Sequence, residues 1–250
     1  MTLKDFFAVH PRAALAFSGG VDSAYLLYAG LQAGAELRPY FVKTVFQPGF
    51  ELKDAQRLCR ELGVPLRVLT PDILAHAQVR ENSPARCYHC KTVILSAIRA
   101  AAAEDGFTLL LDGSNASDLA ADRPGMRALA EAQVLSPLRL CGLSKAEIRR
   151  LSREAGLFTW DKPAYACLAT RIQTGVPIEA ETLQRIEAAE SWLTAQGFTN
   201  LRVRSRGAGA LLQFDRTQLP EALLRAEELK RGLPGGFCPI EIDPEGRNNP

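Results

Sequence analysis

The distribution of apolar residues divides the first two thirds of the chain into short runs and segments of helical spacing. Short apolar runs bounded by turn residues indicate buried strands, whereas apolar residues recurring every three or four positions indicate helices. The runs predict strands at residues 13–17, 38–45, 66–70, 108–112 and 133–137. The periodic segments predict helices at 22–32, 51–62, 90–104 and 144–157, the last beginning with the capping-box pattern Ser144-Lys-Ala-Glu147. Strands that alternate with helices in this way predict an α/β domain, a Rossmann-like parallel sheet with helices on both faces.

The pattern changes after Gly175-Val-Pro177. A long amphipathic helix at 179–196 precedes strand-like runs at 201–205 and 210–214, a helix at 218–231 and a last strand at 237–242. This order predicts a small α+β domain. We therefore expect a first domain over residues 1–175, a C-terminal α+β domain over 176–243 and a disordered tail over 244–250.

Composition and charge exclude several classes of protein. The 250 residues are 47% apolar and 23% charged, and 30 basic residues nearly balance 28 acidic ones, so bulk charge does not indicate a nucleic-acid partner. No stretch approaches the ~18 consecutive apolar residues of a membrane helix, and the N-terminus does not resemble a signal peptide. We expect a cytoplasmic protein, a homo-oligomer, in which the six cysteines (59, 87, 90, 141, 167 and 238) point to metal or redox chemistry before disulfides.

The stretch AFSGGVDS, Ala16 to Ser23, joins the first predicted strand to the first predicted helix. A Gly19-Gly20 turn lets backbone amides approach a ligand, and the helix that follows directs its N–H groups to the same place. Ser18 and Ser23 add hydroxyl donors. The stretch predicts a phosphate site, although an ordinary strand-to-helix turn remains an alternative. It lacks both the lysine of G-x-x-x-x-G-K-[ST] and the Rossmann spacing G-x-G-x-x-G.

SGGVDS resembles the PP-loop signature SGGxDS of ATP pyrophosphatases. The resemblance implies that ATP is cleaved between its α- and β-phosphates and that the loop holds the departing pyrophosphate. Ser18, Gly19, Gly20, Asp22 and Ser23 would bind ATP, with Asp22 near the Mg²⁺-bound phosphates. Lys43 and Thr44 follow the second strand, where these enzymes hold adenine.

Three further stretches, in this order after SGGVDS, resemble the LarE family of ATP-dependent sulfur transferases. They are Asn82-Ser-Pro-Ala-Arg-Cys-Tyr-His-Cys-Lys91, Leu111-Asp-Gly-Ser-Asn-Ala-Ser-Asp118 with the following Asp122 to Arg127, and Lys162-Pro-Ala-Tyr-Ala-Cys-Leu-Ala-Thr-Arg171. The resemblance covers residues 13–175 and is weaker beyond them. It implies adenylation of a carboxylate of pyridinium-3,5-biscarboxylic acid mononucleotide and its conversion to a thiocarboxylate, a step in making the nickel-pincer nucleotide cofactor of lactate racemase.

The cysteines bear on the source of sulfur. Some members of the family sacrifice the sulfur of one cysteine in the CLA-x-R segment, whereas others use that cysteine with a C-x-x-C pair to hold a 4Fe–4S cluster that binds sulfide. This sequence has Cys87, Cys90 and Cys167, and three thiolates would leave one iron without a protein ligand. The alternatives are a sacrificial Cys167, a zinc site completed by Cys141, and a redox C-x-x-C. Cys59 is predicted to pack in the core, and Cys141 and Cys238 are expected to be structural.

A substrate with one phosphate and two carboxylates needs several cations, and arginine suits such anions. By resemblance, Asn115 contributes to the ATP site. The predicted substrate-binding residues are Arg86, Lys91, Asp118, Arg123, Arg171, Arg202 and Arg204, and Arg127 flanks the same motifs. Ser205-Arg-Gly-Ala-Gly replaces the H-G-D continuation found after the family's V-R-V-R run.

Three rival functions use the same loop. A tRNA-thiolating enzyme should carry a basic extension, which the balanced charge does not show. An amidating synthetase would need no cysteine triad, and a non-enzymatic PP-loop module should have lost Ser18 or Asp22.

Overall fold

The computed structural model describes residues 1–118 and 124–247 of the chain. They form two compact units: unit 1 comprises Met1–Ile73 and Ala85–Lys162, and unit 2 comprises Leu74–Pro84 and the chain from Pro163 onward. Unit 2 therefore includes a short segment before residue 85 that the sequence pattern assigned to the first domain.

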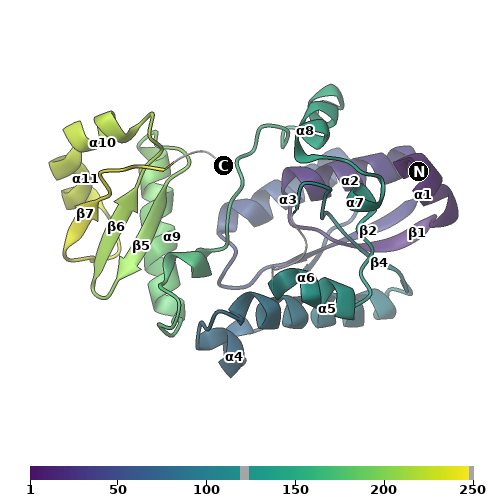
Figure 1. Cartoon of the computed structure of the whole chain (residues 1–250), viewed down its shortest axis with the longest axis horizontal. Helices are drawn as coiled ribbons and strands as arrows, with labels where there is room; N and C mark the ends of the chain where they lie inside the picture. The colour runs from purple at the N-terminus through teal and green to yellow at the C-terminus, as the bar shows by residue number, and fades with distance from the viewer. Residues whose placement is uncertain (119–123, 248–250) are drawn as a thin grey trace. The chain divides into compact units, whose positions relative to one another are not determined.

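Unit 1 is built on a four-stranded parallel sheet with the order β3-β2-β1-β4 (Figure 1). The strands are β1 (Arg12–Ala16), β2 (Glu36–Val42), β3 (Arg67–Leu69) and β4 (Leu110–Asp112). The predicted α/β fold with a parallel sheet is thus confirmed. The expected fifth strand at 133–137 is reduced to one parallel bridge between Leu111 and Leu135, because the chain turns into a helix at Pro137.

Helices cover both faces of this sheet, as predicted. They are α1 (Leu3–Val9), α2 (Val21–Gln32), α3 (Gly49–Glu61), α5 (Arg86–Glu104), α6 (Pro124–Glu131), α7 (Pro137–Leu140) and α8 (Lys145–Glu154). Helices α2 and α3 lie on one face and α5 and α6 on the other (Figure 1). No helix within the described residues is both long enough and apolar enough to cross a membrane.

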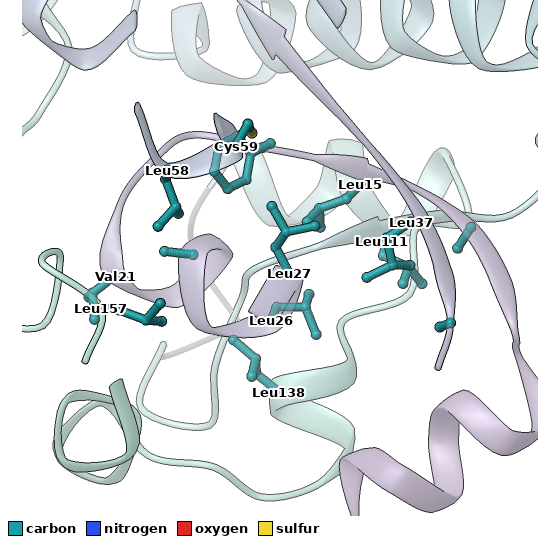
Figure 2. Packing of buried hydrophobic residues seen from close by; sticks show 14 of the residues in the cluster. Leu15, Val21, Leu26, Leu27, Leu37, Leu58, Cys59, Leu111, Leu138 and Leu157 are labelled. Atoms are coloured by element: carbon teal, nitrogen blue, oxygen red, sulfur yellow. The ribbon is translucent and has the colours of Figure 1, made fainter. Parts of the chain in front are cut away.

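Alternate residues of β1 enter two separate apolar clusters, because side chains of a strand point to opposite faces. Leu15 packs in the cluster with Val21 and Leu26 of α2 and Leu58 of α3 (Figure 2), whereas Ala14 belongs to the cluster on the α5 face. Burial on both faces explains why the first strand is a continuous apolar run rather than an alternating one. The run therefore ends in polar residues only at the edge of the sheet, at Ser18.

Unit 2 contains a three-stranded sheet with the order β5-β6-β7. Strands β5 (Arg202–Arg206) and β6 (Gly209–Gln213) are antiparallel, and β7 (Ile240–Ile242) runs parallel to β6. The other elements are η1 (Ile73–Ala75, at the junction of the units), α4 (Ala77–Arg80), η2 (Leu168–Arg171), α9 (Ala180–Ala195), α10 (Leu219–Leu224) and α11 (Ala226–Gly232). Helix α9 buries Leu183, Ile186 and Leu193, a helical spacing that matches the predicted amphipathic helix.

Two details of unit 2 differ from the expectation. The predicted helix at 218–231 is interrupted at Arg225, which ends α10 and begins α11. The Arg225 guanidinium donates hydrogen bonds to Gln196 O and Gln196 Oε1. The tail was expected to lack structure from residue 244, yet the Arg247 amide donates to Phe214 O at 2.7 Å. The chain is therefore tied to unit 2 as far as residue 247.

Candidate active site

The SGGVDS segment forms a tight loop between β1 and α2. Gly19 has a φ of +71°, a conformation that side chains other than glycine rarely adopt, and a Cβ there would lie 3.2 Å from Ala55 Cβ on α3. Ser18 Oγ and Ser23 Oγ are 3.1 Å apart, and Ser23 Oγ also accepts from Ser18 N at 3.3 Å. These bonds fix the shape of the loop.

The loop leads into a helix start that no side chain caps. Gly20 is the N-cap of α2 and offers no side-chain acceptor. The first N–H groups of a helix have no intrahelical partner, and the helix dipole places partial positive charge there. The loop therefore has the uncapped helix start that an anion site requires, and anion binding there stays a prediction.

Gly113, which the sequence analysis did not select, brings the end of β4 against this helix start. A Cβ on Gly113 would lie 2.9 Å from Ser23 N and 3.1 Å from Ser23 Cα. Real Cβ atoms do not approach backbone so closely, so only glycine fits here. The signal was present in the sequence as the glycine of Asp112-Gly-Ser-Asn115, at the carboxyl end of an apolar run.

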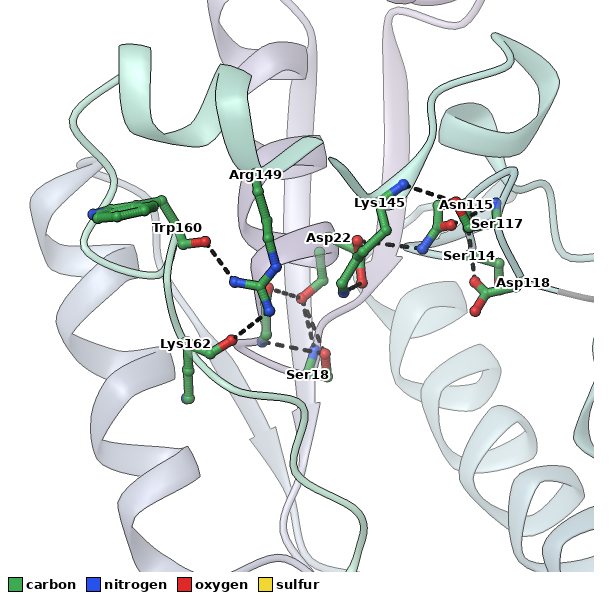
Figure 3. A network of polar contacts seen from close by, with 12 residues as sticks. Ser18, Asp22, Ser114, Asn115, Ser117, Asp118, Lys145, Arg149, Trp160 and Lys162 are labelled. Carbon is green, nitrogen blue, oxygen red and sulfur yellow. Dashed lines mark hydrogen bonds and ion pairs between the residues drawn. The ribbon is translucent and has the colours of Figure 1, made fainter. Parts of the chain in front are cut away.

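Asp22, the acidic residue of the loop, is held by two side chains from distant elements. Its Oδ2 is 2.5 Å from Lys145 Nζ, and Asn115 Nδ2 donates to Oδ1 at 3.4 Å (Figure 3). Lys145 is a second residue that the sequence analysis missed, because it was read only as part of the capping box that begins α8. The cap itself is confirmed: Ser144 Oγ accepts from Glu147 N at 3.3 Å.

The segment after β4 forms a polar corner beside the loop. Asp112 is buried and accepts hydrogen bonds from Ser114 Oγ at 2.5 Å and Ser136 Oγ at 2.6 Å. Asn115 is also buried, and its backbone N–H donates to Asp118 Oδ2 at 2.9 Å. The structure thus places Asn115 against Asp22, whereas Asp118 closes the turn that holds Asn115.

Lys43 and Thr44 line a hollow of about 250 Å³ at the carboxyl ends of β2 and β3. The rest of the lining comes from Val45, Thr70, Pro71, Asp72 and Ile73. Thr44 Oγ1 donates to Gln47 Oε1 at 2.8 Å, and Lys43 Nζ donates to Thr44 O at 3.0 Å, so both side chains are tied to their own loop. The hollow lies at the sheet edge where ligands bind in open α/β folds.

The three selected cysteines are divided between the units. Cys87 is exposed and Cys90 half-buried on the first turns of α5, three residues apart and hence on neighbouring positions of one helix face. Cys167, half-buried, precedes η2 in unit 2. Among the described residues, no group of three His, Cys, Asp or Glu side chains is arranged to hold a metal ion.

The remaining cysteines have other surroundings. Cys59 lies in the core beside Leu58, as predicted, and burial raises the pKa of its thiol to about 12. Cys141 packs at the edge of the same cluster, and burial raises the pKa of its thiol as well. Cys238 is exposed. A raised pKa disfavours the thiolate, which is the form that binds metals.

The cations predicted to bind substrate in unit 1 lie around α5 and α6. Arg86 is buried at the start of α5, with Nη2 3.5 Å from Cys87 Sγ. Arg127 stacks on the Tyr88 ring with its guanidinium carbon 3.8 Å from the ring centre, and Lys91 is half-buried beside α6. Arg123 lies outside the described residues.

Arg171 occupies the interior of unit 2, with 1% of its surface exposed. Its guanidinium donates to both oxygens of Glu190, at 2.8 and 3.0 Å, and to the Ala166 carbonyl at 2.6 Å. Burial opposes its charge, but the hydrogen bonds and charge of Glu190 outweigh burial and keep its pKa above the usual value. Arg171 was predicted to bind substrate, but in this structure its guanidinium is buried and hydrogen-bonded to Glu190 and to the backbone of the Cys167 segment.

Arg202 and Arg204 project from β5 toward the same segment, as their alternation on a strand predicted. Arg202 Nη1 is 3.3 Å from Thr170 Oγ1, and Arg204 Nη1 donates to Thr170 O at 3.1 Å. Both residues are half-buried, so part of each side chain faces solvent. These two arginines, unlike Arg171, can contact an anionic ligand.

Several known proteins resemble this chain in sequence over most of its length. The chain is 33% identical to an uncharacterized protein of Synechocystis sp., with 98% of this chain and 92% of that protein aligned. It is 29% identical to pyridinium-3,5-bisthiocarboxylic acid mononucleotide synthase of Lactiplantibacillus plantarum, over 93% and 85% of the two chains. It is 28% identical to tRNA(Ile)-lysidine synthase of Zymomonas mobilis, over 84% and 72%. No family model matches the chain.

The parallel sheet, the glycine loop at the start of α2 and the polar corner after β4 define a nucleotide-binding α/β protein. The chain belongs to the PP-loop ATP pyrophosphatase superfamily. The mononucleotide synthase and the lysidine synthase to which it is similar are ATP-dependent enzymes of this superfamily.

Proposed function

We propose that this protein is a LarE-type ATP-dependent sulfur transferase. It would adenylate a carboxylate of pyridinium-3,5-biscarboxylic acid mononucleotide, release pyrophosphate and convert the activated carboxylate to a thiocarboxylate. The observation that carries the proposal is the SGGVDS loop, whose Asp22 is held by Lys145 and Asn115, in a chain that also bears Cys87, Cys90 and Cys167. The relative from Lactiplantibacillus plantarum, named as the synthase of the corresponding bisthiocarboxylic acid, supports the substrate class.

Adenylation needs groups that hold phosphates, and the described residues offer them. Amides of the loop and the start of α2 would receive the pyrophosphate part of ATP, with the hydroxyls of Ser18 and Ser23 beside them. Asp22 is an oxygen ligand of the kind that Mg²⁺ prefers and lies next to these donors. The hollow beside Lys43 and Thr44, of about 250 Å³, would take adenine. No general base is required, because the attacking carboxylate is already ionised.

The substrate would be held mainly by cationic side chains. The proposed cations are Arg86 and Lys91 of α5, Arg123, and Arg202 and Arg204 of β5, and Asp118 is proposed to accept a hydrogen bond from the substrate. Arg171 is instead proposed to support the Cys167 segment. Arginine's planar fork suits the phosphate and the two carboxylates of such a substrate.

Sulfur would come through Cys87, Cys90 and Cys167. Two thiols on one turn of α5 fit one cluster as a chelating pair, and Cys167 of unit 2 would be the third ligand; a 4Fe–4S cluster held this way would supply sulfide from its open iron. The second candidate for the sulfur source is Cys167 alone, converted to dehydroalanine. The half-buried position of Cys167, on a segment held by Arg171, is compatible with either role.

A product analysis tests the adenylation step. With ATP, Mg²⁺ and the biscarboxylic acid mononucleotide, we expect AMP and pyrophosphate, measured by phosphorus NMR. Glu36→Gln, a change on the exposed start of β2, serves as a control that should behave as the wild type. Formation of ADP and phosphate would contradict the proposal, and thiolation of tRNA in place of the mononucleotide would favour the tRNA-modifying alternative.

A second experiment separates the two sulfur sources. The anaerobically reconstituted protein should be brown, and Cys87→Ala, Cys90→Ala and Cys167→Ala should each lose both the colour and sulfur transfer with added sulfide. Cys59→Ala and Cys238→Ala should keep both. A protein that loses the mass of one H₂S per turnover, with Cys87 and Cys90 dispensable, would instead establish Cys167 as a sacrificial donor.

The homo-oligomeric state and the cytoplasmic location of the protein stay predictions.

A further inference from the structure

Lys162, the last residue of unit 1, brings its ammonium group to the SGGVDS loop from 143 positions away in the sequence. Its Nζ lies 2.6 Å from Asp54 Oδ2 and 3.4 Å from the carbonyl oxygen of Gly19. Asp54 precedes Ala55, the residue of α3 on which Gly19 packs. The ammonium group therefore lies where the loop meets α3, and the Lys162 side chain is only 15% exposed.

Arg149 of α8 fixes the backbone that carries this lysine. Its Nη1 donates to Trp160 O at 2.7 Å and its Nη2 donates to Lys162 O at 2.9 Å (Figure 3). Two parallel donors on a rigid plane can bridge two carbonyls, whereas a lysine offers a single point charge. Because Arg149 is four residues after Lys145, one face of α8 serves both Asp22 and the Lys162 segment.

The charge around the loop suggests what Lys162 does. The loop has no lysine of its own of the kind found in G-x-x-x-x-G-K-[ST], yet pyrophosphate carries several negative charges. Lys162 offers three N–H donors, and its carboxylate partner Asp54 is 31% exposed, so the pair can exchange with solvent and with anions.

We infer that Lys162 binds the pyrophosphate part of ATP at the SGGVDS loop, in competition with Asp54, and that Arg149 is a positioning residue for Lys162. The inference rests on the proposed ATP pyrophosphatase reaction and adds to it the cation that the loop sequence lacks. The alternative is that the Lys162–Asp54 pair only ties the chain before Pro163 to α3.

Two substitutions distinguish these roles because they act in opposite directions on phosphate binding. Lys162→Met removes the cation but keeps its apolar stem, and Asp54→Asn removes the competing carboxylate and leaves the cation in place. Both break the same ion pair. A purely structural pair predicts equal effects, whereas a phosphate-binding lysine predicts opposite ones.

The probe is inorganic pyrophosphate with Mg²⁺, titrated into the full chain by calorimetry. Lys162→Met should weaken pyrophosphate binding about 10- to 100-fold, the size of one lost charged hydrogen bond. Asp54→Asn should bind as tightly as the wild type or more tightly. Arg150→Gln is the matched control, because Arg150 lies on the same helix and pairs with Glu147 and Glu154 of that helix. Equal weakening by both pair variants, or no weakening by Lys162→Met, would overturn the inference.

The role of Arg149 has its own readout. Arg149→Gln should weaken pyrophosphate binding several-fold. Arg149→Lys should weaken it to a similar extent, because a lysine cannot bridge the two carbonyls as the guanidinium does. Since Arg149 acts through Lys162, adding Arg149→Gln to Lys162→Met should cause no further loss, whereas independent effects would add. Additive losses would overturn the positioning role.

These outcomes are separable from those of the proposed function. Pyrophosphate binding needs no turnover, so it tests Lys162 even if the acceptor is a different molecule. Release of ADP from ATP would refute the pyrophosphatase reaction, while an unaltered pyrophosphate affinity in Lys162→Met would refute only the assignment of the lysine.

Discussion

The cations at the SGGVDS loop in unit 1 and the guanidinium of Arg171 in unit 2 are both paired with carboxylates, but water reaches them to different degrees. The side chains of Lys145 and Asp22 are 35% and 22% exposed, whereas those of Arg171 and Glu190 are 0% and 7% exposed. The lysine contacts a single carboxylate oxygen, and the arginine bonds to both oxygens of Glu190.

This difference in exposure agrees with the roles proposed for the two regions. A half-exposed lysine can leave its carboxylate for a phosphate at little cost, since such pairs contribute about 0–1 kcal/mol. A buried arginine cannot, because separating it from its partner leaves an unpaired charge in an apolar surrounding. The comparison indicates a site in unit 1 that exchanges ionic partners and a support in unit 2 that does not.

The largest effect is expected from breaking the buried pair. Arg171→Met or Glu190→Gln should lower the free energy of unfolding of unit 2 by about 3–5 kcal/mol, because the remaining group loses its partner. Denaturant unfolding measures this. The double variant Arg171→Met/Glu190→Met should be less destabilised than either single variant, and single losses below about 1 kcal/mol would contradict the comparison.

The next effect should appear in activity with little change in stability. Asp22→Ala should lower the rate of adenylation by about 10²–10³-fold, since it removes the carboxylate that we propose as a ligand of the phosphate-bound metal. Lys145→Met should also slow adenylation, with a change in unfolding free energy within about 1 kcal/mol. Pyrophosphate release and thermal unfolding measure the two quantities. A large stability loss in either variant would show that this pair is structural, like that of Arg171.

Gly113→Ala tests the close packing that holds the loop. Its Cβ would lie 2.9 Å from Ser23 N, and the nearest atoms are all backbone of Asp22 and Ser23, which leaves little room to relax, so we expect a loss of about 1–3 kcal/mol in unfolding free energy. ATP binding should weaken in parallel because the start of α2 shifts. Gly125→Ala is the control, since among the described residues the nearest atom that its Cβ would meet is Lys91 Cδ, at an ordinary contact distance of 3.7 Å. Equal stability of both variants would show that the close packing of Gly113 on Ser23 does not stabilise the loop.

The smallest effect is expected at the cap of α8. Ser144→Ala removes the hydroxyl that accepts from Glu147 N and should cost about 1 kcal/mol, whereas Ser144→Gly should cost only a few tenths. Because α8 presents Lys145 to Asp22, the Michaelis constant for ATP should rise slightly in Ser144→Ala. An unchanged unfolding free energy would show that packing, and not the cap, holds the helix.

Much of the structure of unit 1 could be predicted, because its strands and its loop are specified by short contiguous stretches of sequence. The run Ala13 to Phe17, buried on both faces, identified a central parallel strand, and SGGVDS identified the loop from the need for glycine at Gly19. The break at Arg225 was not predictable, because the sequence has a helical pattern on both sides of it and does not reveal the hydrogen bonds from its guanidinium to Gln196, the residue that caps the end of α9.

The sequence alone determined the fold class, the anion-binding loop, the burial of Cys59 and the superfamily, since each depends on neighbouring residues or on a contiguous motif. Only the tertiary structure decided which cations serve which carboxylates. Lys145 meets Asp22 across 123 positions, and Lys162 meets Asp54 across 108. It also decided that Arg171 supports the interior of unit 2 while Arg202 and Arg204 remain partly exposed. The physical reason is that a basic side chain has the same local pattern wherever it points, and its partner is fixed only when strands and helices far apart in the chain pack together.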